Sequence, residues 1–384
     1  MDVLVRANRN MRFTHFDDMP SEARASLLPV VEMGEYVGII EQTRTGSGAR
    51  SIKTVSHTTL AVLRSLEKPE SIGDVFAKLD VRIADIASLV FDGLLEAADH
   101  RAAFVSGPKA LDIFLKRTRP SIPSGYLSCI SREAIDFYAR VETATPIDLA
   151  WKLYQFNRYP VTPESAARWF RPDFDELMLG RATYAQRRLL GEHFERVLDA
   201  ERLGWIAWTA KAFRHAKDTS ERCKLYVSPR PDQTAWAFRE VVDYVPESAA
   251  TGFKLGVYSH GLMRPDKIVL YFDDFAALRR THATLESRLS GVPVQGVPFS
   301  CQLDARGLFS WGADPRTRGH LSWHSDDSWR MWVCNRLAGA LFDGRRAQLS
   351  PEDVMRYALV RAELHGVDVQ TWARSHFNLP IGPA

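Results

Sequence analysis

Apolar and polar residues alternate most clearly in the second half of the chain. Beyond Gly204, period-two hydrophobicity occurs in the short runs "KLYVSP", "GFKLGVYS", "KIVLYF", "PFSCQL" and "LFSWG", which is typical of half-buried strands. Helical repeats over about 233–245 and 275–289 separate these runs, and "SPED" from Ser350 begins another helix. The pattern predicts an α+β fold with a mostly antiparallel sheet.

The first hundred residues have the element order of a small winged-helix module. Two strand-like runs, "EYVGIIEQT" and "ARSIKTV", flank a glycine-containing loop that suits a hairpin. Three helical repeats follow, the first from Ser56, the second from Ser71 and the third over "RIADIASLVFDGLL". We therefore expect a winged-helix-like module over residues 1–105.

A segment rich in proline, glycine and serine follows this module. Residues 106–125 are expected to form a partly structured linker, and residues 126–384 the second domain. The second domain begins with a helical tract from about 131 to 202. An aromatic belt in this tract is interpreted as core packing. Its members are Trp151, Tyr154, Tyr159, Trp169 and Phe170.

Composition and motifs argue against several functional classes. The four cysteines are far apart, which argues against a zinc site or a disulfide framework and fits a reducing cytoplasm. No signal peptide and no membrane span are expected. Nucleotide loops, HExxH and GxSxG are absent. The near pair His320 and His324 is interpreted as a polar surface turn. Neither a metal nor a cofactor is expected.

The net charge of +3 is unevenly distributed along the chain. Residues 1–100 carry 11 basic and 15 acidic side chains, so this part is acidic and the remainder is basic. An acidic module is a poor partner for a phosphate backbone. We therefore expect no nucleic-acid partner.

Lysine is rare in this chain, and three lysines lie between 224 and 267, where the strands carry polar residues. Of the 50 basic residues only 11 are lysine. Lys224 and Tyr226 share one face of their strand, and the same period places Lys254, Tyr258 and His260 on one face. Such a face is either solvated or a cleft for an anionic ligand. A lysine, unlike an arginine, can lose its proton when its surroundings lower its pKa.

The order of these motifs carries a family resemblance. "CKLYVSPRPDQTAWAFREVVDYV", then "GFKLGV", "KIVLYF", "LESRLSGVPVQG" and "LFSWGADPRTRG", resembles the catalytic region of the OspF/SpvC phosphothreonine lyases. With "WKLYQFNRYPVTP" upstream, roughly residues 125–345 are more similar to the HopA-like proteins. That family includes a bacterial type III effector and lyases of class V lanthipeptide and thioamitide pathways. The front module resembles the PqqD-like element that binds the leader of a ribosomal precursor peptide; a scaffold or dimerisation module is the alternative.

The resemblance implies β-elimination of phosphate from phosphoserine or phosphothreonine, without a cofactor. Lys224 stands at the position of the family's base, and Lys254 at that of a cation that lowers its pKa or holds the substrate. Tyr226 replaces the histidine of the phosphothreonine lyases, so either Tyr226 or His260 would protonate the leaving group. Further candidates for phosphate binding are Tyr258, Arg264, Lys267, Tyr271, Arg316 and Arg318.

The expected function is therefore that of a cytoplasmic lyase in peptide natural-product maturation. A separate Ser/Thr kinase would phosphorylate the precursor peptide, since this chain has no nucleotide loop. The front module would hold the leader and keep the core peptide close to the site. The main alternative is a non-catalytic peptide-binding scaffold that partners the kinase, and a second is a secreted effector that acts on phosphorylated host proteins.

Overall fold

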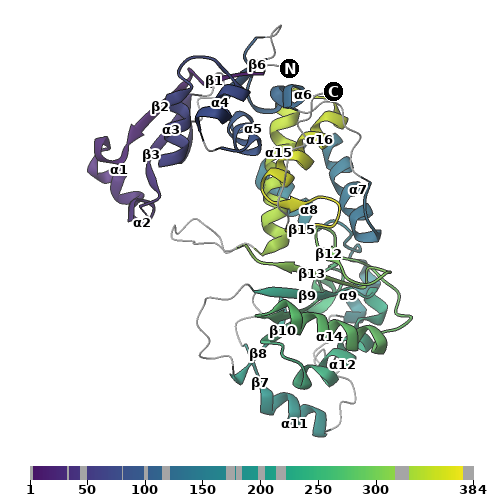
Figure 1. Ribbon diagram of the computed structural model, residues 1–384. Helices are drawn as coiled ribbons and strands as arrows, with labels where there is room; N and C mark the ends of the chain where they lie inside the picture. The colour runs from purple at the N-terminus through teal and green to yellow at the C-terminus, as the bar shows by residue number, and fades with distance from the viewer. Residues whose placement is uncertain are drawn as a thin grey trace.

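An N-terminal module, a group of long helices and a lobe built on a sheet follow one another in space (Figure 1). This arrangement comes from a computed structural model. It describes residues 3–32, 34–43, 50–79, 81–98, 103–114, 122–169, 178, 184–197, 204–212, 222–315 and 328–374. Helices and antiparallel sheets are both extensive, so the predicted α+β class is confirmed.

The N-terminal module contains two small antiparallel sheets. The first has the order β5-β1-β6 and the second β2-β3-β4. Their strands are β1 (Leu4–Ala7), β2 (Met11–His15), β3 (Tyr36–Thr43), β4 (Arg50–Ser56), β5 (Glu70–Ser71) and β6 (Leu95–Ala98). The helices are α1 (Ser21–Ser26), α2 (Leu28–Glu32), α3 (His57–Ser65), α4 (Ile72–Lys78) and α5 (Ile83–Phe91). The predicted order of two strands and three helices is present, from β3 to α5, and β1 and β2 precede it.

The side chains of Ser56 and Ser71 cap two of these helices. Ser56 accepts a hydrogen bond from Thr59 N, and Ser71 accepts one from Asp74 N. Each bond satisfies a backbone donor that the first helical turn leaves unpaired. Both predicted helix starts are confirmed.

The central part of the molecule consists of helices from two distant parts of the chain. They are α6 (Leu111–Phe114), α7 (Tyr126–Arg140), α8 (Pro146–Tyr154), α15 (Trp329–Arg346) and α16 (Pro351–Leu364). The two-stranded sheet of β14 (Val367–Asp368) and β15 (Ala373–Arg374) follows α16.

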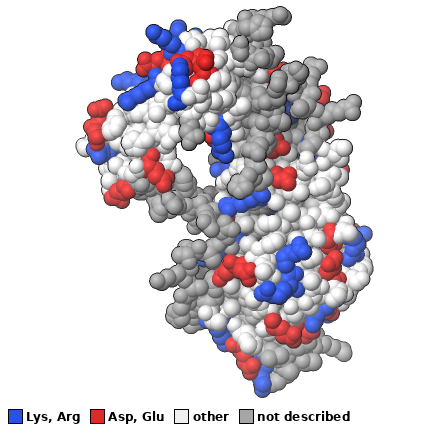
Figure 2. Space-filling view, viewed as in Figure 1, with Lys and Arg blue, Asp and Glu red and all other residues white. Residues whose placement is uncertain are grey.

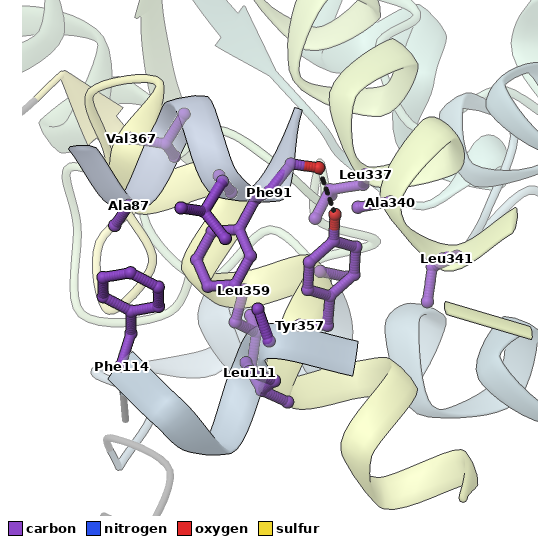
Figure 3. Close-up of a cluster of buried hydrophobic side chains, with 14 of the residues drawn as sticks. Ala87, Phe91, Leu111, Phe114, Leu337, Ala340, Leu341, Tyr357, Leu359 and Val367 are labelled. Carbon is purple, nitrogen blue, oxygen red and sulfur yellow. Dashed lines mark hydrogen bonds between the residues drawn. The ribbon is translucent and has the colours of Figure 1, made fainter. Parts of the chain in front are cut away.

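One hydrophobic core joins the N-terminal module to the central helices (Figure 3). The Phe91 ring at the end of α5 lies edge-on to Phe114 of α6 and to Tyr357 of α16, at 5.8 and 5.5 Å between ring centres. The Tyr357 hydroxyl donates a 3.5 Å hydrogen bond to the Phe91 carbonyl. Leu111 and Phe114, which fall in the predicted linker, are buried in the same core. The first part of the predicted linker, through Phe114, therefore belongs to the shared core.

The second lobe is a seven-stranded antiparallel sheet with the order β12-β13-β9-β11-β10-β8-β7. Its strands are β7 (Phe194–Arg196), β8 (Trp205–Ala210), β9 (Cys223–Val227), β10 (Gly252–Gly256), β11 (Ile268–Phe272), β12 (Cys301–Gln302) and β13 (Phe309–Ala313). Its helices are α9 (Pro163–Trp169), α11 (Tyr184–His193), α12 (Thr234–Tyr244), α13 (Tyr258–Leu262) and α14 (Phe275–Arg288). The expected antiparallel sheet is present.

The two faces of this sheet have different chemistry. On one face Leu225, Phe253 and Leu270 pack with Phe238 of α12 and Leu278 of α14 in a dry core. The opposite face is turned toward α8 and α15, which lie on the other side of the sheet from α12 and α14 (Figure 1). The residues between the sheet and these two helices are therefore the ones that can form a site.

Several local predictions were wrong. β7 lies inside the tract expected to be helical, and β8 was not predicted at all. Of the aromatic belt, Trp169 is buried, but Trp151 and Tyr159 are 53% and 37% exposed. Phe170 lies outside the described residues. Aromatic residues alone do not determine which face of a helix is covered, because that depends on tertiary packing.

The length of the helices and the distribution of surface charge bear on contacts with a membrane or a charged partner. No helix in the described part of the chain is long and apolar enough to cross a bilayer. On the face that Figure 2 shows, basic and acidic side chains lie next to one another over both the N-terminal module and the sheet lobe.

Replacing Phe91 with Ala tests the shared core. Phe91 is 5% exposed, and we expect Phe91→Ala to lower the free energy of unfolding by about 3–5 kcal/mol because it removes buried apolar contacts and leaves a cavity. The measurement is urea unfolding. The control is Phe137→Ala, whose side chain is 52% exposed and should change stability by about 0.5 kcal/mol or less. Equal effects of the two variants would contradict a core that joins the module to the helices.

Candidate active site

Four predicted side chains come together on the polar face of the sheet. β9 pairs with β11 so that Lys224 lies opposite Tyr271 and Tyr226 opposite Val269. β10 pairs with β11 so that Lys254 also lies opposite Val269. Because directly paired residues share a face, Lys224, Tyr226, Lys254 and Tyr271 all lie on it. This clustering was predicted from the period-two pattern.

Lys224 is held by a carboxylate from the neighbouring strand. Its Nζ lies 2.5 Å from Asp314 Oδ2, and its side chain is 12% exposed. The other carboxylate oxygen of Asp314 accepts a 2.9 Å hydrogen bond from Trp329 N at the start of α15. Gly312 lies directly opposite Lys224. A Cβ at Gly312 would lie 2.6 Å from Trp329 Cδ1, so only glycine allows this approach.

Lys254 is the lysine of this face that has no carboxylate at ion-pair distance among the described residues. Its Nζ lies 3.9 Å from the centre of the Trp205 ring and 5.7 Å from that of Tyr271. Burial lowers its pKa to about 8, and the positive charges of Lys224 and Arg264 act in the same direction, while Asp266 partly opposes them. About a tenth of the amine is therefore neutral at pH 7, far more than for a lysine with the ordinary pKa of about 10.4.

Asp266 is the buried anion of the site. Its oxygens accept hydrogen bonds from Arg264 Nε at 2.9 Å, from Arg264 Nη2 at 3.0 Å and from the Tyr154 hydroxyl at 2.8 Å. Arg330 Nη1 lies 2.9 Å from Asp266 Oδ2. Burial would raise the pKa of Asp266, but Arg264 and Arg330 hold it far below its ordinary value. Asp266 therefore stays ionised.

Arg330 links this anion to the helices above the sheet. It is fully buried. Besides Asp266, it donates from Nε to the Pro298 carbonyl at 2.9 Å and from Nη2 to the Tyr154 carbonyl at 2.8 Å. Its guanidinium also lies 4.4 Å from the centre of the Tyr154 ring. Arg330 is therefore a structural cation that fixes the start of α15 and the end of α8 around Asp266.

Both tyrosines of the face are protonated hydroxyl donors. Tyr226 is 3% exposed, and burial, with Asp314 nearby, raises its pKa well above the ordinary value. Burial likewise raises the pKa of Tyr271. The Tyr271 ring lies 5.6 Å from Lys224 Nζ and 5.7 Å from Lys254 Nζ, and so stands between the two ammonium groups.

Tyr258 and His260 are not on the strand face where the sequence pattern put them. The strand ends at Gly256, and both residues belong to α13. Gly256 and Gly261 pack so closely that a Cβ at Gly256 would lie 2.7 Å from Gly261 O. Tyr258 adopts a φ of +54° and is 40% exposed. A period-two pattern could not reveal that the backbone leaves the sheet at this point.

His260 is held by an arginine from the connection after α8. Arg158 Nη2 lies 3.2 Å from His260 Nδ1 and 3.1 Å from the His260 carbonyl oxygen. A guanidinium can only donate, so Nδ1 faces it as an acceptor. Arg158 therefore engages both Nδ1 and the carbonyl oxygen of His260.

The structure places the other cations that were expected to bind phosphate in different surroundings. Lys267 is fully buried and donates to the Pro229 carbonyl at 2.7 Å and to Gln295 Oε1. Burial lowers its pKa to about 7, and this placement argues against a phosphate contact. The donors of Arg264 face Asp266, as described above. Arg316 and Arg318, with His320 and His324, lie outside the described residues.

Sequence reasoning missed the groups that organise the cations. Asp314 follows Gly312 by two residues in "SWGADP", so strand periodicity could have placed it on the polar face. Asp266 and Arg330 are distant in sequence and meet only through the fold. Arg158 lies in the quoted motif "FNRYP" but was given no role. No group of three or more potential metal ligands occurs in the part of the chain that the structure describes.

Comparisons with known proteins find only distant structural likeness. No family model and no curated protein matches the chain. An effector protein from Pseudomonas syringae pv. syringae strain 61 is similar at 14% identity and a TM-score of 0.39, covering 65% of this chain and 100% of its own. The Chromobacterium violaceum VirA (SpvC) phosphothreonine lyase effector has 15% identity and a TM-score of 0.29, covering 49% of this chain and 85% of its own.

A third neighbour is OspF from Shigella flexneri, a type III effector and phosphothreonine lyase. It has 12% identity and a TM-score of 0.28, and the match covers 55% of this chain and 99% of OspF. Likeness at this level gives no residue correspondence. The roles proposed below therefore rest on contacts within this chain.

Replacing Asp266 with Asn tests whether the carboxylate holds the site together. We expect Asp266→Asn to lower the free energy of unfolding by about 3–5 kcal/mol at neutral pH, because Arg330 stays buried without its counter-charge. The measurement is urea unfolding. The control is Asp232→Asn, an exposed partner of Arg230 at 3.6 Å, which should cost about 1 kcal/mol or less.

The pH dependence of the free energy of unfolding is a second test of Asp266→Asn. Folding lowers the pKa of Asp266, so its stabilisation is complete above the unfolded carboxyl pKa of about 3.9 and is lost as the pH falls toward the folded value. The stability gap between the wild-type protein and Asp266→Asn should therefore narrow in acid. A gap that is independent of pH would contradict the ion-pair explanation.

Proposed function

We propose that this protein is a lyase that eliminates phosphate from phosphoserine or phosphothreonine in a ribosomal precursor peptide. The product would be dehydroalanine or dehydrobutyrine. The observation that carries the proposal is Lys254, a lysine with a pKa of about 8 that lies among further cations and has no carboxylate partner among the described residues. Such a group is suited to act as a base near neutral pH, beside a site for an anion.

In the proposed reaction the neutral amine of Lys254 removes the Cα proton of the phosphorylated residue. The electron pair of that C–H bond forms the Cα=Cβ double bond, and the Cβ–O bond breaks with its electrons leaving on phosphate. Charge that develops on the adjacent peptide carbonyl oxygen is stabilised by Lys224, whose ammonium is fixed by Asp314. Lys224, the base expected from the resemblance, thus becomes the electrostatic partner.

Tyr226 is proposed as the donor to the leaving oxygen. Its buried hydroxyl is protonated and shares the face with both lysines. His260 is the weaker candidate, because it lies on α13 rather than on the strand face and its ring contacts Arg158. The proton taken by Lys254 returns to Tyr226 through solvent, so the phosphate leaves with one proton and the enzyme is regenerated. The chemistry needs no cofactor in this scheme.

The N-terminal module is proposed to hold the leader of the peptide, and a separate Ser/Thr kinase to supply the phosphate. β4 is an edge strand of the β2-β3-β4 sheet, and edge strands accept extended peptides through backbone hydrogen bonds. Ile52 on this strand is 57% exposed, so an apolar side chain is available at this edge for a peptide contact. The PqqD-like role expected for residues 1–105 agrees with this edge.

The pH dependence of elimination tests Lys254. With a phosphoserine peptide, we expect kcat/KM to rise about tenfold per pH unit up to a pH near 8, as the amine loses its proton. Lys254→Met should lower kcat/KM by about 10²–10⁴-fold. Mass spectrometry of the peptide measures the loss of phosphoric acid. The matched control is Lys152→Met, a surface lysine paired with Asp148, which should leave turnover unchanged.

Other outcomes of this assay decide between the alternatives. A peptide that is bound but keeps its phosphate in every variant would support the non-catalytic scaffold. Turnover of a phosphorylated folded protein in preference to any leader-bearing peptide would favour the effector. Elimination that survives Lys254→Met but not Lys224→Ala would return the role of base to Lys224.

A charge on the β4 edge tests leader recognition. We expect Ile52→Asp to raise KM for a leader-bearing phosphopeptide by about tenfold, because a carboxylate cannot replace an apolar contact of about 1–2 kcal/mol, while kcat stays the same. KM for the phosphorylated core peptide alone should not change. Leu28→Asp, at another exposed apolar residue of the module that is 48% exposed, is the control. Equal KM values for the wild-type protein and Ile52→Asp would rule out this edge.

A further inference from the structure

Arg158 is a cation of the site for which the described residues provide no carboxylate at ion-pair distance. Arg264 and Arg330 both contact Asp266. Arg158, in contrast, donates to neutral groups, namely the His260 carbonyl and Nδ1 from Nη2 and Gln155 Oε1 from Nη1 at 3.3 Å. No ion pair of Arg158 with a carboxylate occurs among the described residues. The positive charge of Arg158 is therefore not balanced by a carboxylate in direct contact among the described residues.

The backbone around Arg158 is fixed from both sides. Asn157 adopts a φ of +65°, and its Nδ2 donates to the Gln295 carbonyl at 2.7 Å and to the Gly296 carbonyl at 3.0 Å. Gln295 Nε2 donates back to the Asn157 carbonyl at 2.6 Å. On the other side, Tyr159 N donates to the Met263 carbonyl at 3.0 Å. Asparagine adopts the left-handed region readily, and these bonds hold the backbone on both sides of Arg158 in one conformation.

The electrostatic surroundings of Arg158 favour a bound anion. Burial lowers its pKa, and the charge of Arg264 lowers it further, while Asp266 only partly opposes this. The cations Arg158, Arg264 and Lys254 therefore share one region in which Asp266 is already engaged by two guanidinium groups. A partly buried cation beside another cation is costly unless an anion joins it.

Capping of α13 accounts for only part of this arrangement. The bond from Nη2 to the His260 carbonyl closes the end of that short helix, a task that a lysine or a glutamine can also perform. A guanidinium also keeps its charge at every physiological pH and is well suited to bind an oxyanion. Phosphate is the oxyanion that the proposed reaction brings to this region.

We infer that Arg158 is the residue whose guanidinium binds the phosphate group of the substrate, while Arg264 remains on Asp266 and supports the site indirectly. This inference rests on the proposed function. The phosphate would lie between Arg158 and the polar face of the sheet, with Lys254 reaching the Cα proton of the same residue. Recognition of the phosphate and removal of the proton are then carried out by different cations.

Peptide binding with and without phosphate tests the inference. Two peptides of one sequence, one with phosphoserine and one with serine, are titrated calorimetrically into Lys254→Met protein, which cannot turn over the substrate. Adding Arg158→Gln should weaken binding of the phosphopeptide by about 10–100-fold, as expected for the loss of a charge-assisted pair. Binding of the unmodified peptide should not change. Arg158→Lys should recover part of the loss.

The control is Arg140→Gln, a surface arginine paired with Asp136 at the end of α7, which should affect neither peptide. Unchanged phosphopeptide affinity in Arg158→Gln would overturn the inference, and so would an equal loss for both peptides, which would indicate a structural role. A wild-type protein that does not distinguish the two peptides would overturn it as well.

Kinetics of the single variant separate this inference from the proposed function. If the wild-type protein eliminates phosphate and Arg158→Gln raises KM by a similar factor with a smaller change in kcat, both stand. If elimination proceeds and the variant is unaffected, only the inference fails. If no elimination occurs but phosphate-dependent affinity is lost in Arg158→Gln, the lyase proposal fails and the phosphate contact stands.

Discussion

The carboxylate of Asp266 is the interaction on which the arrangement of this site depends. It lies immediately before β11 and is bound by Arg264 from the same loop, Tyr154 from the end of α8 and Arg330 from the start of α15. Two buried guanidinium groups would otherwise repel each other in a region of low dielectric. One negative charge thus joins the helices to the sheet, and the polar face of the sheet is enclosed between them.

The ion pairs of Asp266 and Asp314 determine which cations of the site are left to contact a substrate. Asp266 engages Arg264 and Arg330, and Asp314 engages Lys224. Among the described residues, Lys254 has no carboxylate partner and a pKa of about 8, and Arg158 is bound to neutral groups. A base and a phosphate ligand need opposite properties, because the first must lose its proton and the second must keep it. The use of lysine for one and arginine for the other agrees with this requirement.

Sequence periodicity predicted the strands and their faces, but not what lies across from them. The alternation in "CKLYV" and "GFKLG" placed Lys224, Tyr226 and Lys254 together, because side-chain direction in a strand follows a fixed period. It failed at Tyr258 and His260, where close packing of two glycines ends the strand. Lys267 has the same parity as Tyr271, yet burial beneath Gln295 removes it from the face. Pairings between distant segments, such as Asp266 with Arg330, have no local signal.

The shared core changes how the N-terminal module can act. A flexible linker would let a bound leader raise the effective concentration of the core peptide through chain statistics alone. Here Leu111 and Phe114 of the predicted linker are packed in the shared core, and Asp92 at the end of α5 bridges Arg361 at 2.6 Å and Lys53 at 3.4 Å. Removal of residues 1–105 would therefore take away Phe91 and expose Phe114 and Tyr357, which contact it. This would destabilise α16 as well as remove the module. A leader bound to β4 would lie at a position that side-chain packing fixes relative to the site. The number of residues between the leader and the phosphorylated residue, and not the flexibility of a linker, would then determine which residues reach Lys254.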